Sequence, residues 1–282
     1  NNQPSNSNMF AVATPTQRPA AIRPATSLSI NGSELNGIVT LAENTTIRTD
    51  LGGSVSLAAG KQVNVLGDIN TPSGNITIRI NDKDTEIDNG PTQMVFIGEK
   101  ANLNAAGTTL TLPISQPNLL NTRVYNAGNI SINNQVAGQS GKQEGAVIIK
   151  NGAILDVSGA SVINDTRTAA GFIRETLHGD AGTIQMTGVG SLLIDGAFKA
   201  SATGTGRDGS LALTFDQLVF TDVNGITDPN PFGSGTFAIT QQKQLAANTI
   251  FQGDAIKPDA TLPATVENTQ NLKAQISAQQ IS

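Results

Sequence analysis

Apolar and polar residues alternate in many short runs between residues 28 and 216. The clearest runs span residues 28–30, 38–41, 55–57, 63–65 and 76–80. Alternation with a period of two places the apolar side chains on one face of a β-strand, and glycine, asparagine, aspartate and serine separate the runs as turn residues do. No extended apolar stripe has helical spacing in this region. The pattern therefore predicts an all-β domain over residues 28–216.

The strand runs also resemble one another, because a glycine followed by apolar residues in alternate positions occurs six times. The copies begin at Gly53, Gly74, Gly128, Gly145, Gly182 and Gly209. Residues 53–73 hold three strand signals, at 55–57, 63–65 and 68–70. Three short strands in about 20 residues suit one coil of a parallel β-helix, whose backbone groups are satisfied by coils stacked about 4.8 Å away. We therefore expect a parallel β-helix, with a β-sandwich as the alternative.

In a β-helix the alternate apolar residues of each coil form columns through the interior, and asparagines at the turns can form ladders from coil to coil. The inward columns are expected to contain Val55, Leu57, Val63, Val65, Ile76, Ile78, Ile130, Ile132, Val147, Ile149, Ile154, Val157, Ile184, Leu193, Leu211 and Leu213.

The uneven spacing of the repeats predicts insertions between coils, and insertions in solenoids often carry what is specific to a protein. The insertions are expected near residues 81–93, 111–125, 163–180 and 201–208. Residues 1–27 are rich in proline and predict an extended or disordered linker. After residue 216 the repeat fades, so we expect an irregular cap or linker over 217–263. Residues 264–282 are expected to form a tail, with a short helix as one alternative.

Composition excludes several classes of function. Charged residues make up only 14% of the chain, and the net charge of −5 lacks the basic balance of a nucleic-acid binder. The absence of cysteine excludes disulfides and thiolate metal sites, and the single histidine excludes multi-histidine sites. No apolar stretch is long enough to span a bilayer. We therefore predict neither a nucleic-acid partner nor a transmembrane segment.

Three stretches of the repeat carry a family resemblance. They are Gly53-Ser-Val-Ser-Leu-Ala-Ala-Gly60 with Val63-Asn-Val-Leu-Gly67, Gly152-Ala-Ile-Leu-Asp-Val-Ser-Gly-Ala160 with Asn164-Asp165, and Gly182-Thr-Ile-Gln-Met186 with Leu193-Ile-Asp-Gly196. In these stretches the chain resembles the filamentous-haemagglutinin-like exoproteins of Gram-negative bacteria, large adhesins exported by two-partner secretion. The resemblance covers about residues 45–215. It implies a right-handed β-helix, an extracellular or cell-surface location, and adhesion or biofilm-matrix contact. It also implies a host or matrix glycan or protein receptor and an outer-membrane transporter as partners.

The chain departs from that family at the secretion motifs. The family's secretion domains carry Asn-Pro-Asn-Leu and Asn-Pro-Asn-Gly-Ile near their N-termini. The nearest matches here are Gln116-Pro-Asn-Leu119 and Val223-Asn-Gly-Ile226, which are degenerate and lie far along the chain. We therefore expect an internal or C-terminal shaft segment of a larger secreted protein.

A run of alternating acids is the one candidate for a metal site. Asp82, Asp84, Glu86 and Asp88 lie two residues apart, and calcium prefers such oxygen ligands. In an extended strand, however, their side chains are about 6.5–7 Å apart, which is too wide for four of them to share one ion. We therefore predict a solvated acidic loop with at most weak calcium binding, and no dedicated metal site.

The charged insertion at 163–180 is the one candidate for catalysis. It contains Asp165, Arg167, Arg174, Glu175, His178 and Asp180, and Ser158 and Ser161 lie nearby in sequence. A histidine beside a carboxylate can act as a general base, but no nucleophile elbow and no assignable pair of carboxylates accompanies it. We therefore predict a non-enzymatic protein with no catalytic or cofactor-binding residues. The alternative is a β-helical polysaccharide lyase or hydrolase, which would bring residues 81–93 and 163–180 together in one groove.

Overall fold

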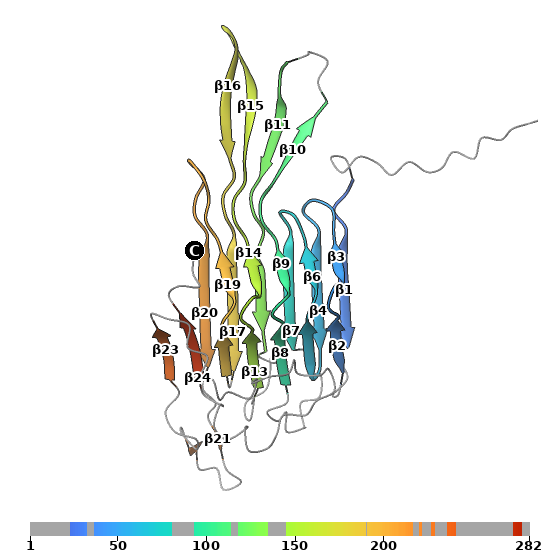
Figure 1. Cartoon of the computed structure of the whole chain (residues 1–282), viewed down its shortest axis with the longest axis vertical. Coiled ribbons are helices and arrows are strands. Elements are labelled where there is room, and N and C mark those ends of the chain that lie inside the picture. The colour runs from blue at the N-terminus through green and yellow to red at the C-terminus, as the bar shows by residue number, and fades with distance from the viewer. Residues whose placement is uncertain are drawn as a thin grey trace, which may run out of the picture.

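The protein was analysed as a computed structural model. It describes residues 23–32, 37–80, 93–113, 118–134, 145–189, 191–216, 220–221, 227–228, 236–240 and 273–277. The described part is all-β: it contains strands and turns and no helix. Three long sheets of parallel strands make up the body of the molecule (Figure 1).

Each large sheet collects strands from along the whole chain. In spatial order, the first sheet contains β1 (Ser27–Gly32), β4 (Ser54–Ala59), β7 (Asn75–Ile80), β12 (Ile130–Asn133), β17 (Thr183–Val189) and β20 (Ser210–Asp216). The second contains β2 (Ile38–Leu41), β5 (Gln62–Val65), β8 (Gln93–Ile97), β13 (Gly145–Ile149), β18 (Ser191–Ile194), β24 (Lys273–Ser277) and β23 (Thr236–Thr240). The third contains β19 (Ala197–Lys199), β14 (Ile154–Asp156), β9 (Asn102–Asn104), β6 (Asp68–Asn70) and β3 (Thr46–Arg48).

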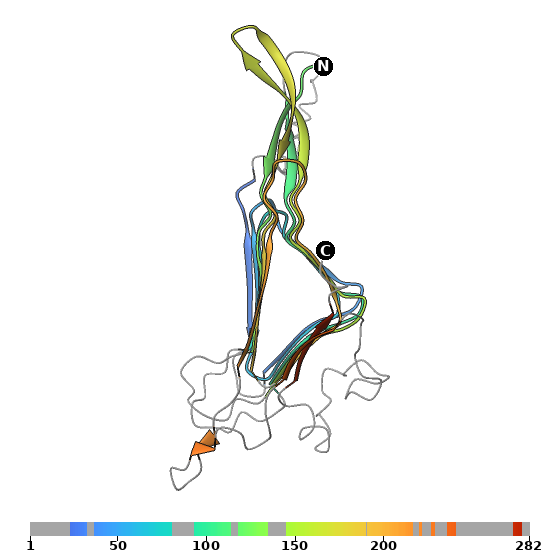
Figure 2. The ribbon, with the colours of Figure 1, turned by 90° about the vertical axis from the view of Figure 1, so that its left-hand side faces the viewer.

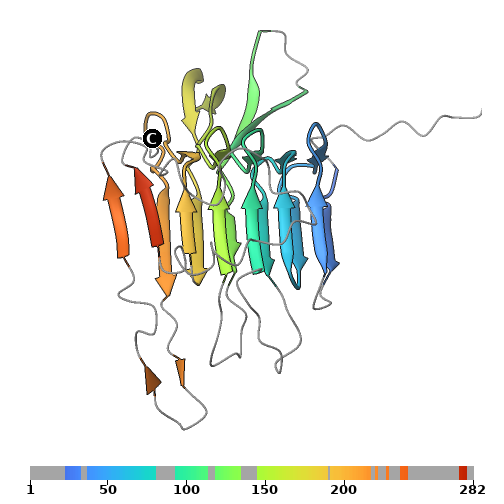
Figure 3. The same ribbon diagram turned by 60° about the horizontal axis from the view of Figure 1, so that its bottom comes forward.

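The chain visits the three sheets in turn. The strands β1, β2 and β3 lie one in each sheet, and the same order repeats from β4, β7, β12 and β17. We call each set of three consecutive strands, one per sheet, a rung. Corresponding strands of successive rungs lie almost on top of one another when viewed along the stack in Figure 2, and Figure 3 shows them side by side. Because all pairs within these sheets are parallel, the β-sandwich alternative, which needs antiparallel sheets, is wrong.

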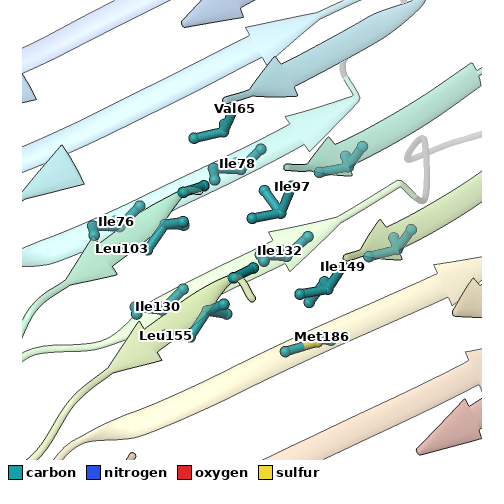
Figure 4. Packing of buried hydrophobic residues seen from close by; sticks show 14 of the residues in the cluster. Val65, Ile76, Ile78, Ile97, Leu103, Ile130, Ile132, Ile149, Leu155 and Met186 are labelled. Carbon is teal, nitrogen blue, oxygen red and sulfur yellow. The ribbon is translucent and has the colours of Figure 1, made fainter. Parts of the chain in front are cut away.

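Apolar side chains from the three sheets form one central core (Figure 4). In the register of the first sheet, Ile130 lies between Ile76 and Ile184, and all three are 0% exposed. The predicted columns are confirmed at twelve fully buried positions, which are Val55, Leu57, Val63, Val65, Ile76, Ile78, Ile130, Ile132, Val147, Ile149, Val157 and Ile184. Leu211 and Leu213 are partly buried and pack against the same core.

Two predicted core positions were wrong by one residue. In β14, Leu155 is the fully buried residue and Ile154 is only half-buried, because the inward positions continue from Ala153 to Leu155 and Val157. In β18, the central core takes Leu192 and Ile194. Leu193 points to the opposite face of the second sheet, where it packs in a separate buried cluster with Met94, Phe96, Ala146 and Ile148. The continuous apolar run 192–194 has no alternation from which its phase could be deduced.

The repeated glycine has a steric cause. Five of the six copies lie one or two residues before a first-sheet strand, and the sixth, Gly145, begins β13 of the second sheet instead. A Cβ atom on Gly128 would lie 1.6 Å from the carbonyl oxygen of Gly74, and one on Gly182 would lie 1.7 Å from that of Gly128. Backbone of the neighbouring rung therefore occupies the space that any side chain would need.

A ladder of polar side chains runs beside this glycine column. The side-chain oxygen of Asn75 accepts the backbone N–H of Asn129 at 3.1 Å, and that of Asn129 accepts the N–H of Thr183 at 3.0 Å. The hydroxyls of Thr183 and Ser210 lie 3.1 Å apart, which continues the ladder to β20. The coil-to-coil ladder expected of the asparagines is therefore present, and it ties together strands that are 54 residues apart in sequence.

The predicted insertions take different forms. Residues 111–125 and 163–180 overlap two antiparallel hairpins, whereas residues 201–208 form turns between β19 and β20. In the first predicted insertion, Gln93 is buried at the start of β8, and residues 81–92 lie outside the described residues. In the expected tail, residues 273–277 form strand β24 rather than a helix. Most of the expected linker, residues 1–22, also lies outside the described part.

Candidate functional site: the paired hairpins

Two hairpins project beyond the three sheets at the same end of successive rungs (Figures 1 and 2). The first hairpin consists of β10 (Thr108–Leu112) and β11 (Asn121–Tyr125), and the second of β15 (Ser161–Thr168) and β16 (Gly171–His178). Each leaves the body after a third-sheet strand and returns to a first-sheet strand. Because the rungs stack, the two hairpins stand side by side, with β11 against β15.

Asp165 joins the two hairpins. Its side chain is only 4% exposed, and its carboxylate accepts the N–H of Leu120 at 2.7 Å. Arg174, the residue opposite it on β16, donates its Nε and Nη2 to the same carboxylate at 2.8 and 2.9 Å. The Asp165 N–H in turn donates to the carbonyl of Leu120 at 2.9 Å. One carboxylate therefore fixes the second hairpin internally and attaches it to the first.

Charge and hydrogen bonding explain the protonation state of this group. The hydrogen bonds from Arg174, followed by the N–H of Leu120, lower the pKa of Asp165 to about 2. The same contact raises the pKa of Arg174. Arg174 Nη2 also donates to the carbonyl of Asn118 at 3.2 Å, which reaches the first hairpin a second time. Asp165 is therefore ionised at neutral pH and serves as a structural link.

A second polar network strengthens the same junction. The backbone N–H of Thr122 donates to Asn164 Oδ1 at 2.9 Å, and the Thr122 hydroxyl donates to the carbonyl of Ile163 at 2.7 Å. Asn164 Nδ2 donates to the hydroxyl of Thr166, which donates to the carboxylate of Glu175. Thr122 is 6% exposed, so these bonds lie in a shielded environment and hold the hairpins in one orientation.

Large apolar side chains lie exposed on this rigid pair. Ile163 is 48% exposed, Phe172 46% and Ile173 50%, and Leu120 at the end of the first hairpin is 36% exposed. Most aliphatic residues of the three sheets are buried, although Leu28, Ile30 and Ile38 in the first rung are 38–40% exposed. Exposed apolar side chains gathered on one projecting element are typical of surfaces that bind a partner.

The candidate catalytic residues have separate partners. His178 Nδ1 lies 3.4 Å from the hydroxyl of Thr203. Asp180 accepts three hydrogen bonds from Arg207, which lower the pKa of Asp180. Ser161 lies opposite His178 in the register of the second hairpin, but among the described residues no hydrogen bond joins His178 to Ser161 or Ser158. Among the described residues, the hydrogen-bond partner of the His178 ring is therefore Thr203 rather than either serine, and the prediction of a non-enzymatic protein stays untested.

The remaining candidates fall outside this site. The acidic run Asp82, Asp84, Glu86 and Asp88 lies outside the described residues, so its convergence with residues 163–180 stays untested. Within the described ranges, no group of three or more acidic or histidine side chains is arranged to hold a metal ion. A hollow of about 360 Å³ lies beside the first rung. It is lined by Arg23, Thr26, Leu28, Ile47, Arg48, Thr49 and Asp50.

The sequence predicts insertions here and singles out the charged stretch that contains Asp165, Arg174 and His178. It missed the link through Leu120 and Thr122, because a hydrogen bond between two insertions 45 residues apart leaves no local pattern. In the described part of the chain, no helix is long and apolar enough to cross a bilayer. No protein-family model matches this sequence, and neither a curated protein nor a solved structure matches it.

Proposed function

We propose that the chain is a right-handed parallel β-helix that serves as a non-enzymatic shaft or adhesive segment of a large secreted bacterial surface protein. Three parallel sheets visited in turn, with stacked glycine and asparagine columns, support the β-helix. In this proposal the rungs supply a stiff support and the paired hairpins make the contact. The resemblance to filamentous-haemagglutinin-like exoproteins supports an extracellular or cell-surface location and export through an outer-membrane transporter.

The observation that carries the proposal is the exposed apolar surface on the two linked hairpins. Ile163, Phe172 and Ile173 are each about half exposed, yet the strands beneath them are fixed through Asp165 and Thr122. A rigid support reduces the entropy that is lost when a partner binds. A glycan or protein of the host or of the biofilm matrix is the partner class that we propose.

Replacing Phe172 by serine tests this role. Beads coated with the purified chain should adhere to host cells or biofilm matrix. F172S should reduce adhesion roughly tenfold, since aromatic residues that become buried on binding contribute much of the binding energy. Ile38→Ser is the matched control, because Ile38 is a 38% exposed apolar residue on a rung strand. Equal adhesion by F172S and the native chain would contradict the proposal. Reproducible shortening of a matrix polysaccharide by the purified chain, lost in His178→Ala, would favour the lyase or hydrolase alternative.

A further inference from the structure

The outer edge of β16 has no strand paired to it in the described part of the chain. Among the described strands, β16 pairs only with β15, and every residue from Gly171 to Thr176 is exposed. Figure 1 shows β16 on the outer side of the hairpin pair. Proteins usually protect such edges with proline, lysine or an inward charge. β16 contains neither proline nor lysine, and its two charged side chains are already bonded within the hairpin, Arg174 to Asp165 and Glu175 to Thr166.

The hydrogen bonds of β15 show which backbone groups of β16 point outward. Asp165 donates its N–H to Leu120, and Ile163 accepts at its carbonyl from Thr122, so both residues direct their backbone groups away from β16. Their opposite residues on β16 are Arg174 and Thr176. In an antiparallel pair, opposite residues direct their backbone groups either toward each other or both away. Arg174 and Thr176, and by alternation Phe172, therefore direct N–H and C=O groups to the outer edge, where no described strand pairs with them.

We propose that a second copy of this chain pairs with this edge, β16 against β16, antiparallel and related by a two-fold axis. The inference rests on the proposed adhesive function. It names a second copy of the chain as one of the partners that the hairpins contact during attachment. A strand added to a free sheet edge gains backbone hydrogen bonds as well as side-chain contacts. The two-fold arrangement uses the same surface on both copies and forms a closed dimer.

The charge pattern disfavours two registers for this pair and favours one in which an aromatic ring faces a guanidinium. The outward backbone groups belong to alternate residues of β16. In a two-fold pair these groups face each other only when the axis passes through a residue, so that this residue lies opposite the same residue of the second copy. An axis at Arg174 or at Glu175 would set like charges opposite each other, which is destabilising. An axis at Ile173 sets two half-exposed isoleucines opposite each other. It also sets Phe172 opposite Arg174 of the second copy, on both sides, where an aromatic ring and a guanidinium attract each other.

This register also leaves room for the rest of the chain. His178 at the base of β16 lies beside Thr203, and a side chain on Gly204 would collide with the histidine ring, so the base of the strand is occupied. Pairing centred on Ile173 uses the outer part of the strand, around Phe172 to Arg174. The two bodies then lie at opposite ends of the paired hairpins, because the strands run in opposite directions.

Sedimentation of the full chain over a range of concentrations tests the pairing. We expect a reversible monomer–dimer equilibrium, and I173K should weaken it at least about tenfold, because two lysines would face each other across the axis. Ile163→Lys is the matched control. Ile163 is 48% exposed on the neighbouring strand, whose other edge lies against β11, so this variant should dimerise as the native chain does. A native chain that stays monomeric at all concentrations would overturn the proposal.

Single cysteines test the register, because the native chain contains no cysteine. Ile173 faces its own copy at a position without hydrogen bonds, where Cα atoms are about 4.5 Å apart and a disulfide can form. Under mild oxidation I173C should give a covalent dimer at high yield, and E175C should not. Efficient cross-linking of E175C instead of I173C would overturn the register.

If Ile173→Lys abolishes dimers but coated beads still adhere to matrix, the pairing exists and the receptor contact is separate. Loss of adhesion in F172S with a monomeric native chain would support the function and reject the pairing.

Discussion

Replacing Gly128 by alanine is expected to destabilise the folded chain by about 3 kcal/mol or more, although it adds a single methyl group. The new Cβ would lie 1.6 Å from the carbonyl oxygen of Gly74 and 2.5 Å from its carbonyl carbon. Neither atom can move as a side chain does, because both belong to the backbone of β7's entry turn. The two rungs must therefore separate locally, which weakens their hydrogen bonds and opens the core around Ile130.

Chemical denaturation followed by far-ultraviolet circular dichroism measures this effect. Gly32→Ala is the matched control, since a Cβ there meets the side-chain atom Val39 Cγ2 at 3.3 Å and backbone oxygens only at 4.0 Å, and the backbone of Gly32 needs no left-handed conformation. We expect its stability to stay within about 1 kcal/mol of the native value. Equal stability of the Gly128→Ala and Gly32→Ala variants would show that the glycine column does not stack as described.

Replacing Asp165 by asparagine is expected to weaken the junction between the two hairpins while the rungs stay folded. The variant loses the charge that pairs with Arg174 and leaves an amide N–H₂ group facing the guanidinium. Tyr125 is the chain's single tyrosine and lies on β11, and the chain has no tryptophan, so its near-ultraviolet signal reports on the first hairpin. We expect a changed tyrosine signal and an unchanged far-ultraviolet spectrum. Asp208→Asn, in the turn before β20, should change neither.

The pH dependence of the same signal follows from the lowered pKa of Asp165. A carboxyl with a lowered pKa stabilises the fold fully above its unfolded pKa, near 4, and loses this contribution as the pH falls toward the folded value, about 2. The tyrosine signal of the native chain should therefore change between about pH 4 and 2. The Asp165→Asn variant should lack this transition. A native transition centred above pH 4, or one that persists in the variant, would exclude Asp165 as the link.

The strands could be predicted from the sequence because period-two alternation encodes which face of a strand is buried. Val63 and Val65 illustrate this, since both are fully buried as expected. The prediction of which residue faces the central core was wrong at Leu193. Residues 192–194 are all apolar, and the second sheet is buried on both faces there, so the sequence has no alternation that distinguishes the two faces. The glycine signature located five first-sheet strands but also matched Gly145, because the local motif fits any strand with apolar residues in alternate positions.

The candidate site was less accessible from the sequence. The charged residues identified the insertion 163–180 as the one candidate for catalysis, and the structure shows that His178 and Asp180 have separate partners there, Thr203 and Arg207. The feature that matters is the buried carboxylate of Asp165, whose partners come from two hairpins. The two hairpins lie side by side because they leave the body at successive rungs, which stack on each other. Such contacts become visible only when the number of residues between successive rungs is known.

The central claim is that strands far apart in sequence stack in register, and a pair of cysteines at Thr77 and Ser131 tests it most directly. These residues lie opposite each other on β7 and β12, and the adjacent inward positions are buried. Neighbouring strands place them about 4.8 Å apart, within reach of a disulfide. Oxidation should give a rapid intramolecular cross-link in T77C/S131C and none in T77C/Q185C, whose positions are two strands apart. Cross-linking of the second pair with none in the first would contradict the stacked arrangement.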